Sequence, residues 1–434
     1  MKISAIAKHS RRSLLFLLLL VLGTAVLAAP ALAKTKITFL DDLSDSEAVE
    51  WLQLAKSRFE ALHPDVEIEI LAMKRDQLLE KIVIMQATDM LPDVVETSPE
   101  VGYEFMQKGF FQDLNPYMMK EANLSWDEYF TPALTAITVE SGEHKGKRWL
   151  LPGTIWLTGA AFNLSLFAEA GLNAPVSHTS QWANQWTWDD FVEMGKKLVR
   201  VDATGKVTRW AAFVPRTWMR WPTWVHNAGG FMFDSYFEPK QSLLNSEPVR
   251  VAINYLYEIY QVYRFAYWSG NFVQGKLPIS FNQGPNCTQL LANAGATFDF
   301  AYGPNPKLVR GGSEVQVVGW VMSATSRHPD IAWEWMKFLS TTMATEYVIQ
   351  TGRPPAWQTV ARRYSELVKT KSPWEHVWID LISHPDSYQR AIYNQDIRNT
   401  MQQAVEAIFD GNQPVGPTLE QLHEVISNYL KENR

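Results

Sequence analysis

The most constraining feature of the sequence is an alternation of strand and helix patterns near its start. Residues 36–40 and 66–70 alternate apolar with polar side chains, which is the period of a strand that buries one face. Residues 49–62, between them, carry apolar side chains at helical spacing, and a second helical stretch over 76–87 leads into a short apolar run after Pro92. Strand, helix, strand, helix, strand in that order predicts a parallel α/β sheet.

Polar residues follow the first and third of these strands. Asp41 and Asp42 come directly after the first strand, and Glu96 and Ser98 lie at the end of the third. In parallel α/β sheets, ligands bind outside the carboxyl ends of the strands. We therefore expect these four side chains to line a binding site.

Further helices are expected in the second half of the chain. Ser246 is a plausible cap for a helix that runs to Tyr263, and residues 326–340 form an amphipathic pattern. Thr418 and Gln421 match a capping box, which predicts that the last helix begins there.

Size and charge restrict the class of protein. A chain of 434 residues is long enough for roughly two or three globular units. The net charge of -6, without a cluster of lysine and arginine, argues against binding to nucleic acid. Cys287 is the one cysteine in the chain, so no intramolecular disulfide and no thiolate metal cage can form, and the nine histidines have no ligand spacing. We expect no metal and no cofactor, and Cys287 to be a small packing residue.

The first 33 residues have the order of a secretory signal peptide. Basic residues precede an apolar run over 14–29, and Ala31-Leu32-Ala33 forms a small-x-small site, so we expect cleavage after Ala33. The apolar run is short for a membrane span, which needs about 20 residues. The mature protein is expected to be periplasmic or secreted, without an integral membrane segment.

Tryptophan is unusually abundant, with 18 in the chain. An indole ring can stack on the apolar face of a sugar while polar side chains bind its hydroxyl groups. Trp156, Trp218, Trp221 and Trp320 lie near loops or expected strand ends and are candidates for stacking. Trp335 is better explained as a core residue, because its helix is amphipathic.

The segment around Trp218 and Trp221 also carries charge. Pro215 and Pro222 argue against a buried helix there, so stacking on a sugar and packing in the core are about equally good interpretations of the rings. Arg216 and Arg220 could bind an anionic substituent, although solvated arginines are an equally good interpretation.

Catalytic motifs are mostly missing. Gly270–Lys276 has the spacing of a phosphate-binding loop but continues with Leu277 in place of Ser or Thr. No G-x-S-x-G elbow is present. Asp41, Asp42 and Glu96 could supply the carboxylate pair of a glycosidase, so an extracytoplasmic glycoside hydrolase or lyase stays open as the alternative to a binding protein.

Several short motifs occur together in one order along the chain. They are Pro92-Asp93-Val94, Leu151-Pro152 leading to Phe162-Asn163, Gly229-Gly230, Gly275-Lys276 running into Asn282-Gln283-Gly284-Pro285, Val318-Gly319-Trp320, the helix 332–339 and Gly352-Arg353-Pro354-Pro355. With the export signal and the α/β start, these motifs resemble the solute-binding proteins of bacterial ABC importers for carbohydrates. The class is the large one that includes maltose- and glycerol-phosphate-binding proteins, and the resemblance extends over nearly the whole mature chain.

The resemblance implies a periplasmic-binding-protein fold, with two α/β lobes and a ligand cleft between them. Several crossovers would act as hinges. By analogy, residues 34–148 and 320–350 form lobe one, and residues 149–319 and 351–434 form lobe two. The implied ligand contacts are Asp41, Asp42, Glu96, Ser98, Trp156, Asn286, Trp320 and Arg353.

Two positions depart from the family pattern. Phe162 stands where many members carry tyrosine, and Asn286-Cys287 stands where many have an aromatic residue after Gly-Pro. The implied function is capture of a sugar or oligosaccharide by hinge closure and delivery to the permease subunits, without covalent chemistry and as a monomer. A sugar phosphate or acidic sugar, held by Arg216, Arg220 or Arg353, is the alternative ligand.

Overall fold

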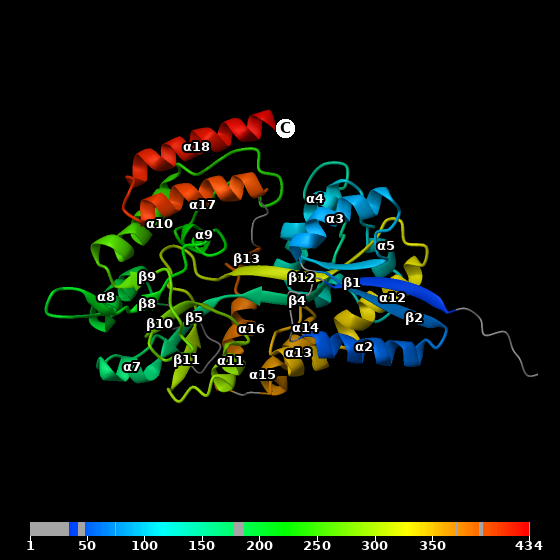
Figure 1. Cartoon of the computed structure of the whole chain (residues 1–434), viewed down its shortest axis with the longest axis horizontal. Helices are drawn as coiled ribbons and strands as arrows, with labels where there is room; N and C mark the ends of the chain where they lie inside the picture. Colours follow the sequence, from blue (N-terminus) through cyan, green and yellow to red (C-terminus); the bar gives the residue numbers. More distant parts are fainter. Residues whose placement is uncertain are drawn as a thin grey trace, which may run out of the picture.

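The computed structural model describes residues 34–41, 48–73, 75–176, 186–369, 372–389 and 394–433. The expected signal peptide over residues 1–33 and the candidate residue Asp42 lie outside the described residues. The elements form two sheets that lie beside each other along the long axis of the molecule, with helices packed around each (Figure 1).

The first sheet has six strands in the order β13-β12-β3-β1-β2, with β4 paired to β12 off this path. Its strands are β1 (Thr35–Asp41), β2 (Val66–Ala72), β3 (Val94–Thr97), β4 (Leu151–Leu157), β12 (Glu314–Met322) and β13 (Tyr388–Gln389). Strand β1 pairs in parallel with both β2 and β3, and the connecting helices are α2 (Val49–Leu62) and α3 (Arg75–Ala87). The α/β start predicted from the sequence is confirmed.

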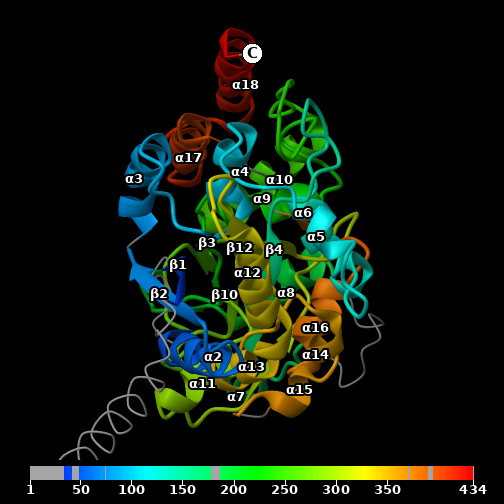
Figure 2. The same ribbon diagram turned by 90° about the vertical axis from the view of Figure 1, so that its right-hand side faces the viewer.

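Further helices surround the first sheet. They are α4 (Pro99–Gln107), α5 (Asn115–Met118), α6 (Thr131–Ile137), α12 (Pro329–Lys337), α13 (Ala344–Thr351), α14 (Gln358–Ala361), α15 (Tyr364–Leu367) and α16 (His376–Ser383). Helices α2 and α13 pack against each other, and both views show them side by side (Figures 1 and 2). As predicted, Trp335 is fully buried in α12, where its ring meets Phe39 and Phe59 edge-on.

The second sheet has five strands in the order β11-β5-β10-β8-β9. They are β5 (Gly159–Asn163), β8 (Ala212–Phe213), β9 (Ala266–Tyr267), β10 (Ile279–Gln283) and β11 (Phe300–Gly303). The helices of this half are α7 (Leu164–Glu169), α8 (Trp188–Leu198), α9 (Pro222–Asn227), α10 (Glu247–Tyr257), α11 (Cys287–Asn293), α17 (Gln395–Phe409) and α18 (Val415–Glu432), with a small hairpin of β6 (Arg200–Val201) and β7 (Val207–Arg209). Helices α17 and α18 lie together over this half (Figure 1).

The chain passes from the first sheet to the second after β4 and returns after β11, and after β13 it continues to the helices α17 and α18 of the second half. Strands β4 and β12 are hydrogen-bonded into the first sheet, and residues 356–382 contribute to the core beside it. The expected lobe ranges grouped β4 and residues 314–319 with the other half. The exact lobe boundaries stay a prediction, and sheet membership favours counting both strands with the first lobe.

Two local predictions were wrong. Pro222 does not exclude a buried helix, because it occupies the first turn of α9, where no backbone N–H is needed from proline. All residues of α9 are buried. The last helix begins at Val415, not at Thr418. The Thr418 hydroxyl donates to the Pro414 carbonyl at 2.7 Å, so it bonds back within the first turn and caps nothing.

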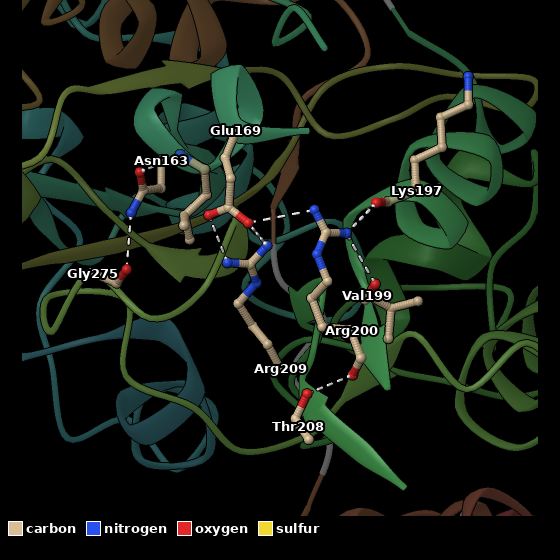
Figure 3. Close-up of polar contacts among 9 residues, drawn as sticks. Asn163, Glu169, Lys197, Val199, Arg200, Thr208, Arg209 and Gly275 are labelled. Carbon is tan, nitrogen blue, oxygen red and sulfur yellow. Dashed lines mark hydrogen bonds and ion pairs between the residues drawn. The ribbon is translucent and has the colours of Figure 1, made fainter. Parts of the chain in front are cut away.

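Two motifs from the sequence meet at the start of α7 (Figure 3). The Asn163 side chain accepts a hydrogen bond from the Leu166 backbone N–H at 3.1 Å and donates to the Gly275 carbonyl at 3.1 Å. At the other end of α7, Glu169 accepts two hydrogen bonds of 3.0 Å from Arg209 on β7. The paired arginine lowers the pKa of the Glu169 carboxyl. Asn163, which caps α7 and binds the Gly275 carbonyl, therefore joins β5 to the loop before β10.

Candidate functional site

Residues from distant parts of the chain meet where β4 and β12 run side by side. Trp156 on β4 lies opposite Gln316 on β12, and Trp320 lies opposite Glu96 on β3. Cross-strand partners share a face of a sheet, and so do residues two or four apart in one strand. Trp156, Gln316, Trp320 and Glu96 therefore lie on the same face.

The turn after α13 brings Arg353 onto this face. Its guanidinium carbon lies 4.2 Å from the centre of the Trp156 ring, which is a cation–π contact. The Thr154 hydroxyl donates to the Pro354 carbonyl at 2.8 Å and fastens the turn to β4. Burial lowers the pKa of Arg353 to about 10, so the side chain is still protonated at neutral pH.

We call Glu96, Trp156, Gln316, Trp320 and Arg353 the crossover cluster. It combines two indole rings with a carboxylate, an amide and a guanidinium, which is the chemistry that a sugar ring and its hydroxyl groups require. Gln316 is extended toward α4, where its amide donates to Glu100 at 3.3 Å. Sequence reasoning missed Gln316 and Glu100, although the polar residue within the apolar strand 314–322 was a usable signal.

Asn286 lies next to the turn of the crossover cluster. It immediately precedes α11 and is half-buried, without a side-chain capping bond. A Cβ placed at Gly352 would stand 3.8 Å from the Asn286 Cα. The structure thus brings Trp156, Arg353 and Asn286 together from β4, the turn and the N-terminus of α11.

Trp320 is packed more tightly than a fully open stacking platform. Its side chain is 6% exposed, its ring stacks on Trp51 with centres 6.3 Å apart, and a Cβ at Gly153 would come within 2.6 Å of it. A cavity of about 30 Å³ lies beside the ring and is also lined by Glu96 and Tyr347. No hydrogen-bond partner for the Trp320 indole N–H exists among the described residues.

Asp41 and Ser98 lie at the ends of β1 and β3, as predicted. Asp41 is half-buried as the last residue of its strand, and its carbonyl accepts from the Met73 N–H at 3.0 Å. Ser98 is fully buried before α4, and its hydroxyl has no partner within the described part of the chain. Ser98 is two residues after Glu96, and Asp41 ends β1, the strand that pairs with β3. Both residues therefore border the crossover cluster.

The tryptophans near α9 lie elsewhere. Trp221 is 1% exposed inside the second hydrophobic core, so neither face of its ring is open in this conformation. Trp218 is half-buried, with the Arg398 guanidinium 4.8 Å from its ring, and lines a cavity of about 120 Å³ with Glu314 and Tyr388. Arg216 forms ion pairs with Asp410 and Glu406, which occupy it with carboxylates.

A larger cavity of about 610 Å³ lies between α6 and the segment 382–389. It is also lined by His226, Tyr236 and Arg310, and by none of the residues predicted from the sequence. Ligands of open α/β sheets bind at the carboxyl ends of parallel strands, which here are the ends of β1 and β3. We therefore place the candidate site at the crossover cluster and not in the larger cavity.

The described residues offer neither a metal site nor a membrane-spanning helix. Within the ranges that the structure describes, no group of three or more His, Cys, Asp or Glu side chains is arranged to hold a metal ion. None of the helices in those ranges combines the length and the apolar character that crossing a bilayer requires. Cys287 is fully buried, as expected for a packing residue.

Comparisons with solved structures agree with the fold described above. The chain is similar to the sugar-binding protein MalE from Xanthomonas citri, with 16% identity, a TM-score of 0.76 and coverage of 92% of this chain and 98% of that chain. It is also similar to UgpB from Mycobacterium tuberculosis in complex with glycerophosphocholine, with 16% identity, a TM-score of 0.74 and coverage of 92% and 99%. An ABC substrate-binding protein from Listeria monocytogenes in complex with cycloalternan gives 18% identity, a TM-score of 0.73 and coverage of 92% and 99%. At these identities the likeness shows the two-lobed fold.

A search of curated protein sequences gives no match. The family model described as bacterial extracellular solute-binding protein matches residues 44–346, which is well over half of the chain. That range includes β2 and β3, the crossover strands β4 and β12, and the second sheet. The chain belongs to the family of bacterial extracellular solute-binding proteins.

Proposed function

We propose that the protein is the substrate-binding receptor of an ABC importer and captures a sugar or oligosaccharide at the crossover cluster. The observation that carries the proposal is the Arg353 guanidinium stacked on Trp156, with Glu96 and Gln316 on the same face. An aromatic ring flanked by hydrogen-bonding groups fits a pyranose, whose apolar face and hydroxyl edge are recognised separately. The similar structures include proteins described as sugar-binding.

Capture by closure follows from the position of the cluster. Strands β4 and β12 carry Trp156 and Gln316, and each leads directly into or out of the second sheet. A ligand that touches both halves stabilises the closed arrangement by its additional contacts there. The closed form would then be recognised by the permease subunits.

The remaining parts of the proposal concern export and oligomeric state. We expect residues 1–33 to act as a signal peptide that is cleaved after Ala33, and the mature protein to work as a monomer outside the cytoplasmic membrane. The family of extracellular solute-binding proteins supports export. Binding requires no covalent step, and no residue of the crossover cluster needs to transfer a proton.

The test is a thermal-shift screen of the mature protein against mono-, di- and oligosaccharides, polyols and sugar phosphates, followed by product analysis of each hit. A ligand that raises Tm by several degrees and is recovered unchanged supports the receptor. Cleaved products would support the glycoside hydrolase or lyase instead. Preference for sugar phosphates, with affinity that falls steeply with salt, would identify an anionic ligand.

A matched pair of variants locates the site. Trp156→Ala should abolish the shift, whereas Trp218→Ala, which removes an indole outside the crossover cluster, should retain it. The reverse result would move the site to the cavity beside Trp218.

A further inference from the structure

A buried carboxyl group lies directly behind the proposed sugar site. Glu375 precedes α16 and is 1% exposed. Within the described ranges no lysine, arginine or histidine forms an ion pair with it, which is unusual because buried carboxylates are normally paired. Nothing in the capture mechanism described above uses this group.

Glu375 is held by hydroxyl groups from two other elements. The Thr288 hydroxyl, in the first turn of α11, donates to one carboxyl oxygen, and the Tyr302 hydroxyl lies 2.9 Å from the Thr288 oxygen. The Tyr364 hydroxyl on α15 lies 3.5 Å from the other carboxyl oxygen. The carboxyl group is therefore the meeting point of α11, α15 and α16.

The Tyr364 hydroxyl faces three acceptors but has a single proton. It is 2.7 Å from the Gly352 carbonyl, 3.1 Å from the Pro285 carbonyl and 3.5 Å from Glu375. Gly352 directly precedes Arg353, and Pro285 directly precedes Asn286. The hydroxyl thus holds the two backbone turns that carry polar candidates for ligand contact.

We infer that Glu375 is a positioning residue for the proposed sugar site, acting through Tyr364 on the turns that carry Arg353 and Asn286, and that the protonated carboxyl holds this site more tightly than the carboxylate. The inference rests on the proposed function for its ligand and on the hydrogen-bond geometry for its mechanism.

The direction follows from donor and acceptor strength. A protonated Glu375 can donate its O–H to the Tyr364 oxygen, which leaves the Tyr364 proton for the Gly352 carbonyl, in agreement with the short 2.7 Å distance. A carboxylate accepts more strongly than a carbonyl and competes for that same proton. Ionisation then removes the donor from Gly352 and frees the turn before Arg353.

Glu375 is also the group here that changes charge near neutral pH. Burial raises its pKa from the usual range to about 7, although the hydrogen bonds from Thr288 and Tyr364 oppose the shift. The titratable neighbours stay protonated in that range: burial raises the pKa of Cys287 to about 12 and places those of Tyr302 and Tyr364 well above their usual value. The exposed Lys369 lines a cavity of about 10 Å³ with Glu375, Thr288 and Gly352.

The first experiment needs no ligand. Amide hydrogen exchange of the mature protein is measured from pH 6 to pH 8, corrected for the intrinsic rate, in the segments 284–290 and 349–356. We expect protection of wild type to fall with rising pH by more than threefold, within the limit of about tenfold per pH unit for one proton. Glu375→Gln keeps a neutral side chain and should show no pH dependence in these segments.

Two further variants separate positioning from simple structural support. Tyr364→Phe should also give flat exchange profiles, because the relay is lost, while the dependence of Tm on pH that Glu375 causes should persist. Glu366→Gln, the same substitution at an exposed residue of α15 paired with Arg363, should behave as wild type. Identical pH profiles in wild type and Glu375→Gln would overturn the inference, as would a pH-dependent profile that survives in Tyr364→Phe.

The ligand arm uses the sugar with the largest thermal shift in the screen. Its Kd in wild type should rise at least threefold from pH 6 to pH 8, and stay constant in Glu375→Gln. A constant Kd in wild type, with exchange that still varies, would refute the role in the sugar site. If no sugar binds, the proposed function fails, and the exchange result still decides whether Glu375 controls the two turns.

Discussion

The guanidinium of Arg353 covers one face of the Trp156 ring at 4.2 Å, and the two residues belong to different segments of the first half of the molecule. Trp156 lies on β4, which continues into the second sheet, whereas Arg353 lies in the turn after α13. One ring face is therefore already occupied by a planar cation, and a sugar would bind at the remaining edge and face together with the guanidinium.

Arg353→Lys tests this pairing. Lysine keeps the charge but loses the planar group that stacks on the indole, and a desolvated cation–π contact of this kind contributes about 1–2 kcal/mol. We expect a loss of roughly tenfold in affinity for the sugar identified by the screen, measured by isothermal titration calorimetry. Arg362→Lys, at the exposed residue directly after α14, is the control and should bind as wild type. Unchanged affinity in Arg353→Lys would show that the stack serves the fold alone.

Trp320→Ala is expected to weaken sugar binding by more than tenfold and also to destabilise the protein. The ring is 6% exposed and packed on Trp51, so its removal should lower the free energy of unfolding by about 3–5 kcal/mol. Calorimetric titration and urea denaturation measure the two effects separately.

The control for Trp320 is another buried tryptophan. Trp333 lies on α12, away from the crossover cluster, and is 3% exposed. Its indole N–H donates to the Glu121 carboxylate at 2.7 Å. Trp333→Ala should therefore destabilise the protein but keep its affinity. Wild-type affinity in a folded Trp320→Ala variant would contradict a role for Trp320 in binding.

Asn163→Ala removes the cap of α7 and the bond to the Gly275 carbonyl (Figure 3). Loss of an N-cap side chain costs about 1 kcal/mol, and the half-buried Gly275 carbonyl left without its donor adds to this. We expect the free energy of unfolding to fall by about 1–2 kcal/mol in urea denaturation. Asn163→Asp keeps the acceptor for the Leu166 N–H and loses the donor, so it should fall between the alanine variant and wild type.

His226 should make the protein less stable in acid. Its ring is buried, stacked on Tyr388 at 3.9 Å, and its Nε2 is 2.7 Å from the Asp386 carbonyl. Burial lowers its pKa from 6.5 to about 4, so the unfolded chain takes up a proton at higher pH than the folded one. The stabilisation is present above pH 6.5 and is lost as the pH falls toward 4, by up to about 3 kcal/mol.

The pH measurement has to separate His226 from Glu375. The raised pKa of Glu375 acts in the opposite direction, because the folded protein then holds the extra proton between about pH 4.5 and 7. Urea denaturation from pH 4 to 8 is therefore compared for Glu375→Gln and for the double variant that carries both Glu375→Gln and His226→Gln. A slope that is unchanged by His226→Gln would refute the assignment.

The sequence predicted the α/β start because β1, α2 and β2 are local patterns with clear periods. It also predicted that Trp335 is buried, since its helix is amphipathic. It could not predict that Trp221 enters the second core, because the placement of α9 depends on contacts with residues distant in the sequence. The pairing of Trp156 with Arg353 could not be predicted for the same reason, because the fold brings the two residues together and no local sequence pattern links them.

Strand β4 contains one extra residue relative to its partner β12, and this matters when relatives are compared. Thr154 lies opposite Val318 while Pro152 lies opposite Gly319, so Gly153 forms a bulge that no residue of β12 faces. Simple alternation from Pro152 would put Trp156 on the same face as Gly319, and the bulge turns it to the opposite face, which it shares with Gln316. A relative without this insertion would carry the equivalent side chain one position closer to the start of its strand. An alignment fixed on the Leu-Pro motif would then compare side chains that point to opposite faces of the sheet, whereas counting backward from the end of the strand would match the equivalent positions.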